Sequence, residues 1–298
     1  MIFKLVLLLS LVGCSTLNEK NNSNKVETSV KPKIKTEVQS IELFTGKVKF
    51  VEFQIYKKDG TYTLKCVDNK SKKTLFFPIS VKSNMASLYM SENYFSKAST
   101  RKCYLESEKV IDLAASVFNY KKERLNVSKK HIDISKNNLA RHIKEKKVRS
   151  KIYSESASYL LFDRPFKVPL SSYITSHFGN QRIFNNKKRS QHLGNDFRAA
   201  VGVKIPASNR GRVVFTGNWF FSGNIVIIDH GMNIFTNYMH LSKILVTPGT
   251  IVNQGDIIGL AGKTGRVSGP HLHWGAKVNG NNVDGFSLVN ASKQHFID

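Results

Sequence analysis

Two histidines stand one residue apart in the segment SGPHLHWGAKVNG, residues 268–280, in a chain that has nine histidines. Residues two apart point the same way on a β-strand and to different sides on a helix. The run from His271 to Val278 has the character of a strand and is followed by Asn279-Gly280, a pair typical of a tight hairpin turn. The segment therefore predicts a strand that carries both imidazoles on one face, about 7 Å apart at the backbone.

The sequence around this strand consists of short Val- and Ile-rich runs separated by turns that contain glycine. A long glycine-rich loop leads into the two histidines. Several short strands at such close spacing are typical of a mainly β domain, which we expect over residues 165–298. The runs that support it are GRVVFTG, NIVIIDHG, NIFTNYMHLS and GDIIGLAG.

Two regions of different character precede this domain. Residues 41–135 hold short β-like runs, with a hairpin pattern around a Lys-Asp-Gly turn, and predict a small β-sandwich-like domain. Residues 136–164 show helix-like spacing of apolar residues among many Lys and Arg, and predict a connecting helix. The expected fold is thus mainly β, in two domains.

The first 14 residues have the layout of a secretory signal, with a lysine followed by a short apolar run. This run is too short to span a bilayer as a helix. The segment Leu11-Val12-Gly13-Cys14 resembles a bacterial lipobox, in which the cysteine is lipidated and becomes the first mature residue. By the same resemblance, Ser15 after the cysteine favours the outer membrane. We expect an exported lipoprotein that faces the periplasm.

Residues 15–40 are polar and poor in large apolar side chains, which predicts a flexible tether rather than a domain. With Cys14 assigned to the lipid, Cys66 and Cys103 remain. In an exported protein they can form a disulfide, and two buried free thiols are the alternative that the sequence leaves open.

The chain is strongly basic, with 46 Lys and Arg against 21 Asp and Glu and a net charge of +25. This excess suggests an anionic partner such as nucleic acid, a membrane surface or an acidic cell-wall polymer. Because the charge is spread along the chain, without a basic helix or an Arg-rich tail, we do not expect a nucleic-acid-binding protein.

A second pair of candidate ligands lies upstream in the segment QHLGNDFR. His192 and Asp196 are four residues apart and share a face on either a strand or a helix. Two imidazoles and one carboxylate, with a fourth position for water, form a hydrolytic zinc site. His192 and Asp196 can supply two ligands, and one histidine of the pair His271 and His273 can supply the third.

Over residues 165–290 the chain resembles the lysostaphin/LytM-type zinc endopeptidases, which cut bacterial peptidoglycan and have an antiparallel, barrel-like β-sheet domain of the duplicated hybrid motif type. The matching stretches occur in the family's order, although HFGNQRIFNN keeps a substrate-groove segment only approximately. By position, the resemblance implies zinc ligands at His192, Asp196 and His273, and catalytic histidines at His240 and His271. The six stretches are HLGND, GRVVFTG, GNIVIIDHG, YMHLS, GDIIGLAGKTG and SGPHLHWG.

The residues themselves support a histidine base. The chain has no His-Glu-x-x-His motif, and Glu155 is its last glutamate, so the metal domain has no glutamate to take a proton from water. Histidine replaces it near neutral pH, and which of His240 and His271 does so stays open. We expect His177, His230 and His295 to be structural or solvated.

Three functions are compatible with this sequence. The first is a zinc endopeptidase that cuts peptidoglycan cross-links, most plausibly D-Ala–diaminopimelate bonds for an outer-membrane lipoprotein. The second is a non-catalytic peptidoglycan-binding regulator that activates other hydrolases, which is expected to lack one of the five site residues. The third is a polyanion binder, which leaves the histidines unused. The sequence does not determine the oligomeric state, and we assume a monomer.

The lipobox generates a direct prediction. Replacing Cys14→Ser removes the thiol that would be acylated, so incorporation of labelled palmitate should be lost and the chain should stay unprocessed or soluble. Labelling of the Cys14→Ser chain equal to that of the parent would contradict the lipoprotein assignment.

Overall fold

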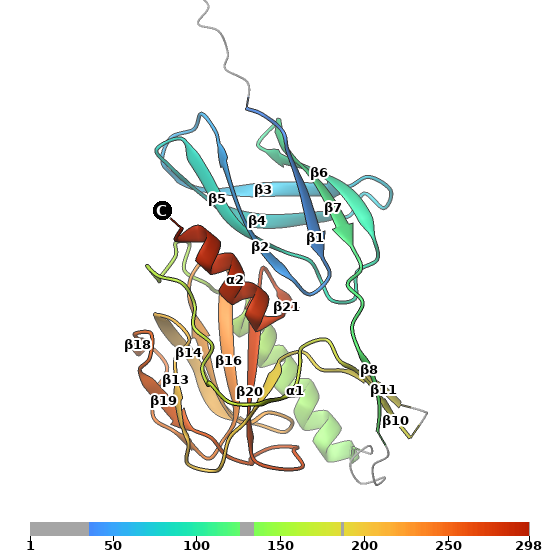
Figure 1. The fold of residues 1–298 in the computed structure, drawn as a ribbon, viewed down its shortest axis with the longest axis vertical. Coiled ribbons are helices and arrows are strands. Elements are labelled where there is room, and N and C mark those ends of the chain that lie inside the picture. The colour runs from blue at the N-terminus through green and yellow to red at the C-terminus, as the bar shows by residue number, and fades with distance from the viewer. Residues whose placement is uncertain (1–35, 126–133, 186–187, 298) are drawn as a thin grey trace, which may run out of the picture. The chain divides into compact units, whose positions relative to one another are not determined.

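The computed structural model describes residues 36–125, 134–185 and 188–297 (Figure 1). The predicted signal, Cys14 and most of the predicted tether lie outside the described residues. Thr36 onward belongs to one compact unit. Within the described part of the chain, neither helix combines the length and the apolar character needed to cross a bilayer.

The accessory sheet is built from the first seven strands, in the order β1-β7-β6-β3-β4-β5-β2. All of its pairings are antiparallel except β1 with β7. Alternate side chains are buried on one face, as period-2 patterning requires. The strands are β1 (Gln39–Phe44), β2 (Val48–Gln54), β3 (Gly60–Asp68), β4 (Thr74–Lys82), β5 (Met85–Ser91), β6 (Ser99–Leu105) and β7 (Glu108–Ser116).

This sheet refines two sequence-based expectations. The edge strands β1 and β2 contact each other, so the strands form one sheet that curls back on itself, where two facing sheets were expected. Gln39 and Ser40 already belong to β1, so the tether predicted over residues 15–40 extends too far. Both differences have the same cause, because β1 completes the curl by pairing with β7.

Cys66 and Cys103 form a disulfide. They lie directly opposite each other on the paired strands β3 and β6, and both side chains are fully buried. The alternative of two free thiols is therefore excluded by the register of the accessory sheet.

The segment between the two sheets has a larger role than a linker. Strand β8 (Lys122–Leu125) pairs in parallel with β10 (Gln181–Phe184), which pairs with β11 (Lys188–Gln191). Helix α1 (Lys136–Ile152) begins where the sequence predicted, and the side chain of Ser135 accepts a hydrogen bond from the Asn138 amide at its N-terminus. The expected region 41–135 therefore ends in a strand that pairs with the C-terminal part of the chain.

The C-terminal sheet follows the order β18-β14-β15-β16-β20-β12-β9, with β21 paired to β20, and a three-stranded sheet β13-β19-β17 accompanies it. The predicted mainly β domain is confirmed. The strands are β9 (Ile174–Ser176), β12 (Asn195–Arg198), β13 (Lys204–Pro206), β14 (Gly211–Trp219), β15 (Gly223–Asp229), β16 (Ile234–Leu241), β17 (Lys243–Ile244), β18 (Ile251–Val252), β19 (Ile257–Leu260), β20 (His271–Val278) and β21 (Asn281–Val283), and helix α2 (Gly285–His295) ends the chain.

The main core lies on one face of this sheet, and the side chains of Trp274 and Tyr238 are fully buried in it. Phe162 also packs into this core. The predicted domains 136–164 and 165–298 are therefore not separate units, because their boundary at residue 165 falls within a continuous core.

The two faces of β20 have different roles, as the alternation of residues 271–278 predicted. Leu272, Trp274, Ala276 and Val278 are buried in the main core, whereas His271, His273 and Lys277 lie on the opposite face. Asn279 and Gly280 both have positive φ, and Val278 pairs with Asn281 across them. The hairpin turn is thus confirmed as a two-residue loop of the primed kind.

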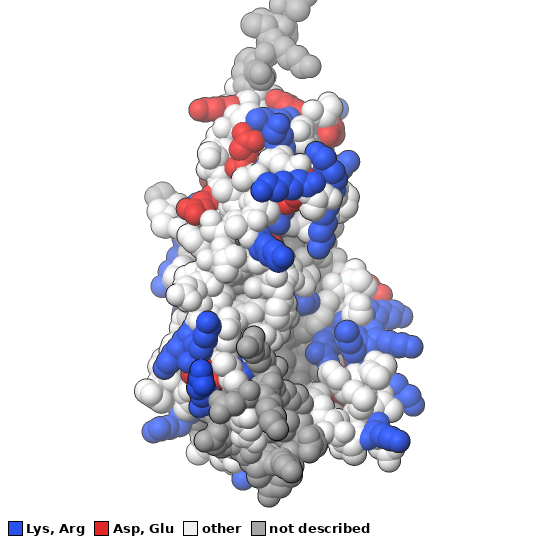
Figure 2. Space-filling view, turned by 90° about the vertical axis from the view of Figure 1, so that its right-hand side faces the viewer, with Lys and Arg blue, Asp and Glu red and all other residues white. Residues whose placement is uncertain are grey.

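The face opposite the core is partly covered by α1. A small apolar cluster of Trp219, Ile225, Ile227 and Phe235 packs against Ile152 and Tyr153 at the end of the helix. The charge of the surface is spread out, as expected: on the face seen in Figure 2, Lys and Arg are scattered widely and Asp and Glu gather mainly near one end.

The disulfide should stabilise the accessory sheet. It closes a loop between residues 37 apart in the sequence, which corresponds to about 2–4 kcal/mol of unfolding free energy. In urea denaturation followed by circular dichroism, the double variant Cys66→Ala/Cys103→Ala should lose that amount of unfolding free energy and show a lower midpoint, while its zinc content stays unchanged. An unchanged midpoint would show that the bridge constrains the unfolded chain little.

Candidate metal centre

The pairing of two short strands brings the candidate ligands together. In the antiparallel pair β12–β20, Asp196 lies directly opposite His273, so the two side chains share a face of the sheet. His192 comes from the loop between β11 and β12. Residues 77 apart in the sequence thereby become neighbours.

The polar atoms of these three residues converge on one another. Asp196 Oδ1 lies 2.7 Å from His273 Nδ1 and 3.0 Å from His192 Nε2, and the two ring nitrogens are 3.1 Å apart. All three ligand atoms lie within 4.8 Å of each other. The structure thus places the predicted trio of His192, Asp196 and His273 in one cluster.

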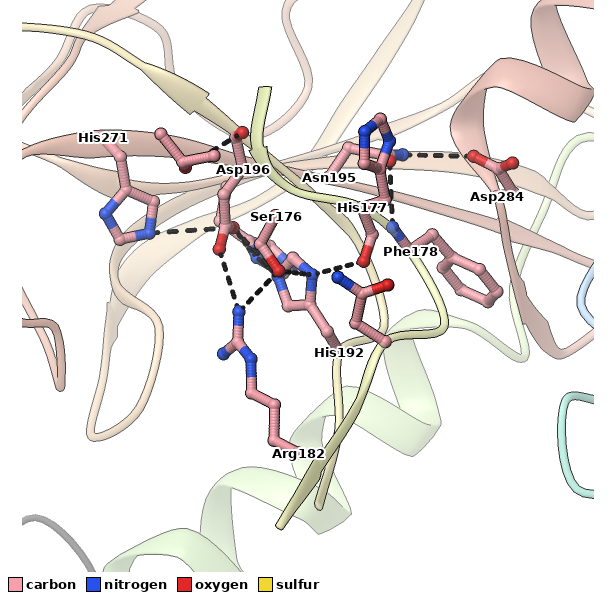
Figure 3. Close-up of polar contacts among 12 residues, drawn as sticks. Ser176, His177, Phe178, Arg182, His192, Asn195, Asp196, His271 and Asp284 are labelled. Atoms are coloured by element: carbon pink, nitrogen blue, oxygen red, sulfur yellow. Dashed lines mark hydrogen bonds and ion pairs between the residues drawn. The ribbon is translucent and has the colours of Figure 1, made fainter. Parts of the chain in front are cut away.

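Backbone contacts orient the His192 ring. Its Nδ1 lies 2.9 Å from the carbonyl oxygen of His177 and 3.2 Å from Ser176 Oγ, as Figure 3 shows. A carbonyl oxygen only accepts hydrogen bonds, so Nδ1 carries the proton and Nε2 keeps its lone pair toward Asp196. Such outer contacts set the tautomer of metal-binding histidines.

Arg182 is a residue of the site that sequence reasoning did not single out. Its guanidinium donates to Ser176 Oγ over 2.7 Å and lies 3.5 Å from Asp196 Oδ2 (Figure 3). Its Nε lies 3.9 Å from a carboxylate oxygen of Glu123 on β8. The sequence signal is the Arg of HFGNQRIFNN, and the pairing of β10 with β11, which ends just before His192, brings it to the centre.

The two predicted catalytic histidines lie beside the trio and are held alike. His240 Nδ1 lies 2.9 Å from the carbonyl oxygen of Thr264, and His271 Nδ1 lies 2.9 Å from that of Gly269. Their ring centroids are 4.8 Å apart. Because each Nδ1 donates to a carbonyl, each ring presents Nε2 as its free nitrogen, and that of His271 is 3.7 Å from Asp196 Oδ1.

The backbone at His240 adopts an uncommon conformation, with φ of 64°. A left-handed conformation is unfavourable for a residue with a side chain and is concentrated at functional sites. Gly262 helps to allow it, since a Cβ at that position would lie only 2.8 Å from the His240 carbonyl oxygen. The close approach of the glycine-rich loop therefore shapes the site.

Burial and mutual contacts shift the pKa values of the cluster. Burial by itself raises the pKa of Asp196, but the close contacts with the His192 and His273 rings outweigh it and hold that pKa far below its ordinary range. Burial lowers the pKa of His273. Burial, aided by the neighbouring His273 and His271, lowers the pKa of His240 to about 3. These pKa shifts favour an ionised Asp196 beside neutral rings at His273 and His240.

This donor set fits zinc. Two imidazole nitrogens and one carboxylate oxygen are the ligands of a catalytic zinc site that leaves a fourth position for water. The absence of a side chain at Gly194 makes room for the His273 ring, since a Cβ at Gly194 would lie 2.3 Å from His273 Nε2.

The three histidines expected to be structural or solvated lie outside the cluster. His177 is exposed, His230 hydrogen-bonds with the Arg210 carbonyl and Thr236, and His295 hydrogen-bonds with Tyr89.

A cleft of about 690 Å³ opens beside the cluster. His192, His240 and His273 line it on the sheet side, and the end of α1 contributes Arg149 and Tyr153. A helix outside the predicted metal domain thereby forms part of the wall next to the site.

Residues 190–285 match the family model described as peptidase family M23. The chain carries an M23 peptidase domain. It is 46% identical over 112 residues to the peptidoglycan DD-endopeptidase ShyA of Vibrio cholerae serotype O1, which covers 37% of this chain and 26% of that protein. It is 40% identical over 98 residues to the DD-carboxypeptidase/endopeptidase Mpg of Neisseria meningitidis serogroup B, covering 33% and 23%. The match thus spans about a quarter of these curated relatives.

A solved structure extends the likeness of the fold beyond this domain. The putative peptidase M23 from Pseudomonas aeruginosa superimposes with a TM-score of 0.57 at 22% identity, covering 83% of this chain and 95% of that one. The similarity of fold therefore extends beyond the M23 match and includes much of the accessory sheet and the connecting segment.

Alanine variants should separate metal ligands from catalytic residues. Asp196→Ala or His273→Ala should lose zinc, because three protein ligands leave no redundancy at a four-coordinate site. His240→Ala and His271→Ala should keep zinc, since their rings are held by carbonyls outside the trio. Elemental analysis of the four purified chains measures this. An empty site in His271→Ala with zinc retained in His273→Ala would reverse the assignment of the pair.

Proposed function

We propose that the chain is a zinc-dependent endopeptidase that hydrolyses peptide cross-links of bacterial peptidoglycan. The observation that carries the proposal is the cluster of His192, Asp196 and His273 at the side of a cleft, with the free Nε2 atoms of two further histidines beside it. The M23 domain and relatives named as peptidoglycan DD-endopeptidases support the same activity.

In the proposed mechanism, His192 Nε2, His273 Nδ1 and Asp196 Oδ1 hold the metal. Bound zinc supplies a water of lowered pKa and polarises the carbonyl of the scissile peptide. The protein's own residues then move the protons. One of His240 and His271 accepts a proton from the attacking water at Nε2, and the same proton is then passed from that Nε2 to the leaving amine nitrogen, while the other histidine helps to stabilise the oxyanion.

The carbonyl contacts explain why histidines can serve both steps. Thr264 and Gly269 keep the Nδ1–H of His240 and His271 engaged, so each ring exchanges protons only at Nε2. Arg182 and Ser176 contact the proposed ligands and are not themselves ligands. They position Asp196 and His192 and thereby the ligand geometry on which the chemistry depends.

The substrate and location follow from the same proposal in finer detail. D-Ala–diaminopimelate cross-links are the proposed substrate, in line with relatives named DD-endopeptidases. The cell envelope is the proposed location, with Cys14 as a lipid anchor in the outer membrane and the peptidase as a monomer in the periplasm. The anchor rests on the Leu-Val-Gly-Cys segment alone.

A non-catalytic regulator is the alternative of a different class. A regulator has no need of a complete ligand trio or of two more histidines held with matching tautomers. All five residues are in place here, which favours the enzyme. A nucleic-acid or polyanion binder would leave the whole cluster without a role.

Digestion of purified cell wall tests the function. The zinc-loaded chain should release fragments cut at peptide cross-links, identified by mass spectrometry, and a chelator should abolish the release. His271→Ala keeps the ligand trio and should lower the rate by roughly 10²- to 10⁴-fold. If parent and His271→Ala act equally on the wall and neither yields cleaved peptides, the chain is a regulator.

A further inference from the structure

The face of β20 that carries His271 and His273 continues to Lys277. The position between His273 and Lys277 on this face is Gly275, which has no side chain. Lys277 lies four positions after His273 on the strand, or about 13 Å along the backbone. The face thus has a metal-binding end, an open middle and a cationic end.

Helix α1 brings a second cation to this end. Arg149 and Lys277 both line the cleft beside the metal centre. The guanidinium of Arg149 lies 5.0 Å from the centre of the Trp219 ring, and Lys277 Nζ lies 5.1 Å from that of Tyr153. Tyr153 is held in turn, because its hydroxyl donates to Asn237 over 2.6 Å.

The two cations lack a counter-charge in the structure. Among the described residues, no carboxylate forms an ion pair with Arg149 or Lys277, and the buried Arg149 Nε has no hydrogen-bond partner. No Asp or Glu occurs among the described residues that line the cleft. Lys146, Arg182 and Arg266 add further positive charge to its walls.

The energetic consequence is visible at Lys277. Burial, and then repulsion from Arg149, lower the pKa of Lys277 to about 8. A buried cation is costly unless an anion or hydrogen bonds compensate it. Aromatic faces provide part of that compensation, but the buried Arg149 Nε still has no acceptor. An anion in the cleft would supply an acceptor and offset both positive charges.

We propose that Arg149 and Lys277 form a carboxylate subsite that binds a free carboxylate of the peptide substrate, three to four extended residues from the bond that is cut. The spacing follows from the 13 Å or so between His273 and Lys277 and about 3.3–3.6 Å per extended residue. This proposal rests on the proposed function and specifies its substrate as an acidic peptide. A planar guanidinium beside an ammonium suits a carboxylate well.

The subsite has a consequence for specificity. Lys277 lies within the matched M23 domain, whereas Arg149 belongs to a helix outside residues 190–285. A subsite shared between the two would let α1 select the substrate although it contributes nothing to the metal cluster.

Binding to a chain that cuts its ligand only slowly tests the subsite. The full chain with His271→Ala is titrated by calorimetry with a cross-linked muropeptide and with the same peptide after amidation of its carboxylates. The free-carboxylate peptide should bind roughly tenfold more tightly. Adding Lys277→Met or Arg149→Gln should remove this preference by weakening the free peptide only, while Arg149→Lys should keep most of it.

Matched controls separate charge recognition from packing. Lys243→Met removes an exposed lysine on β17 and should change neither affinity; circular dichroism and zinc content check the fold of each variant. Equal binding of both peptides to the parent, no binding of either, or an equal loss of both in Lys277→Met would overturn the subsite. Cell-wall cleavage is measured separately, so the enzyme proposal can stand if the subsite fails.

Discussion

The metal cluster depends on one cross-strand pair, Asp196 on β12 opposite His273 on β20. Side-chain direction alternates along a strand, so a slip of one residue in this register would turn one of the two ligands into the core. Their alternating neighbours prevent that slip, because Phe197, Leu272 and Trp274 are buried on the core face. By holding Phe197, Leu272 and Trp274 on the core face, the hydrophobic core keeps Asp196 and His273 on the opposite face, where they can form the cluster.

Backbone carbonyls perform a second task, which is to assign tautomers. His192, His240 and His271 each place Nδ1 against a carbonyl oxygen, from His177, Thr264 and Gly269. Each ring therefore carries its proton on Nδ1 and presents Nε2 as the nitrogen with a lone pair. Two of these carbonyls belong to the glycine-rich loop between β19 and β20, whose close approach depends on residues without a Cβ, as at Gly262.

Much of this could be predicted from the sequence. Period-2 alternation placed His271 and His273 on one face, and Asn279-Gly280 marked the hairpin. The spacing of His192 and Asp196 indicated a shared face, whereas the structure has His192 in the loop before β12 and only Asp196 on the strand. These are local properties, because strand periodicity and turn preference act over a few residues. The M23 resemblance added the roles of His240 and His273, which spacing alone left open. The boundaries at residues 40, 135 and 164 were less well predicted, because pairing partners far along the chain decide where an element belongs.

What the sequence by itself determined is therefore the character of the C-terminal strands and a short set of candidate zinc ligands, in which the choice between His271 and His273 stayed open. Only the tertiary structure decided that Cys66 lies opposite Cys103, that Arg182 reaches Asp196, and that α1 lines the cleft with Arg149 beside Lys277. Each of these contacts joins segments with no shared local pattern. They arise because burying apolar surface fixes strand register and helix placement, and polar side chains on the opposite faces are then carried into contact.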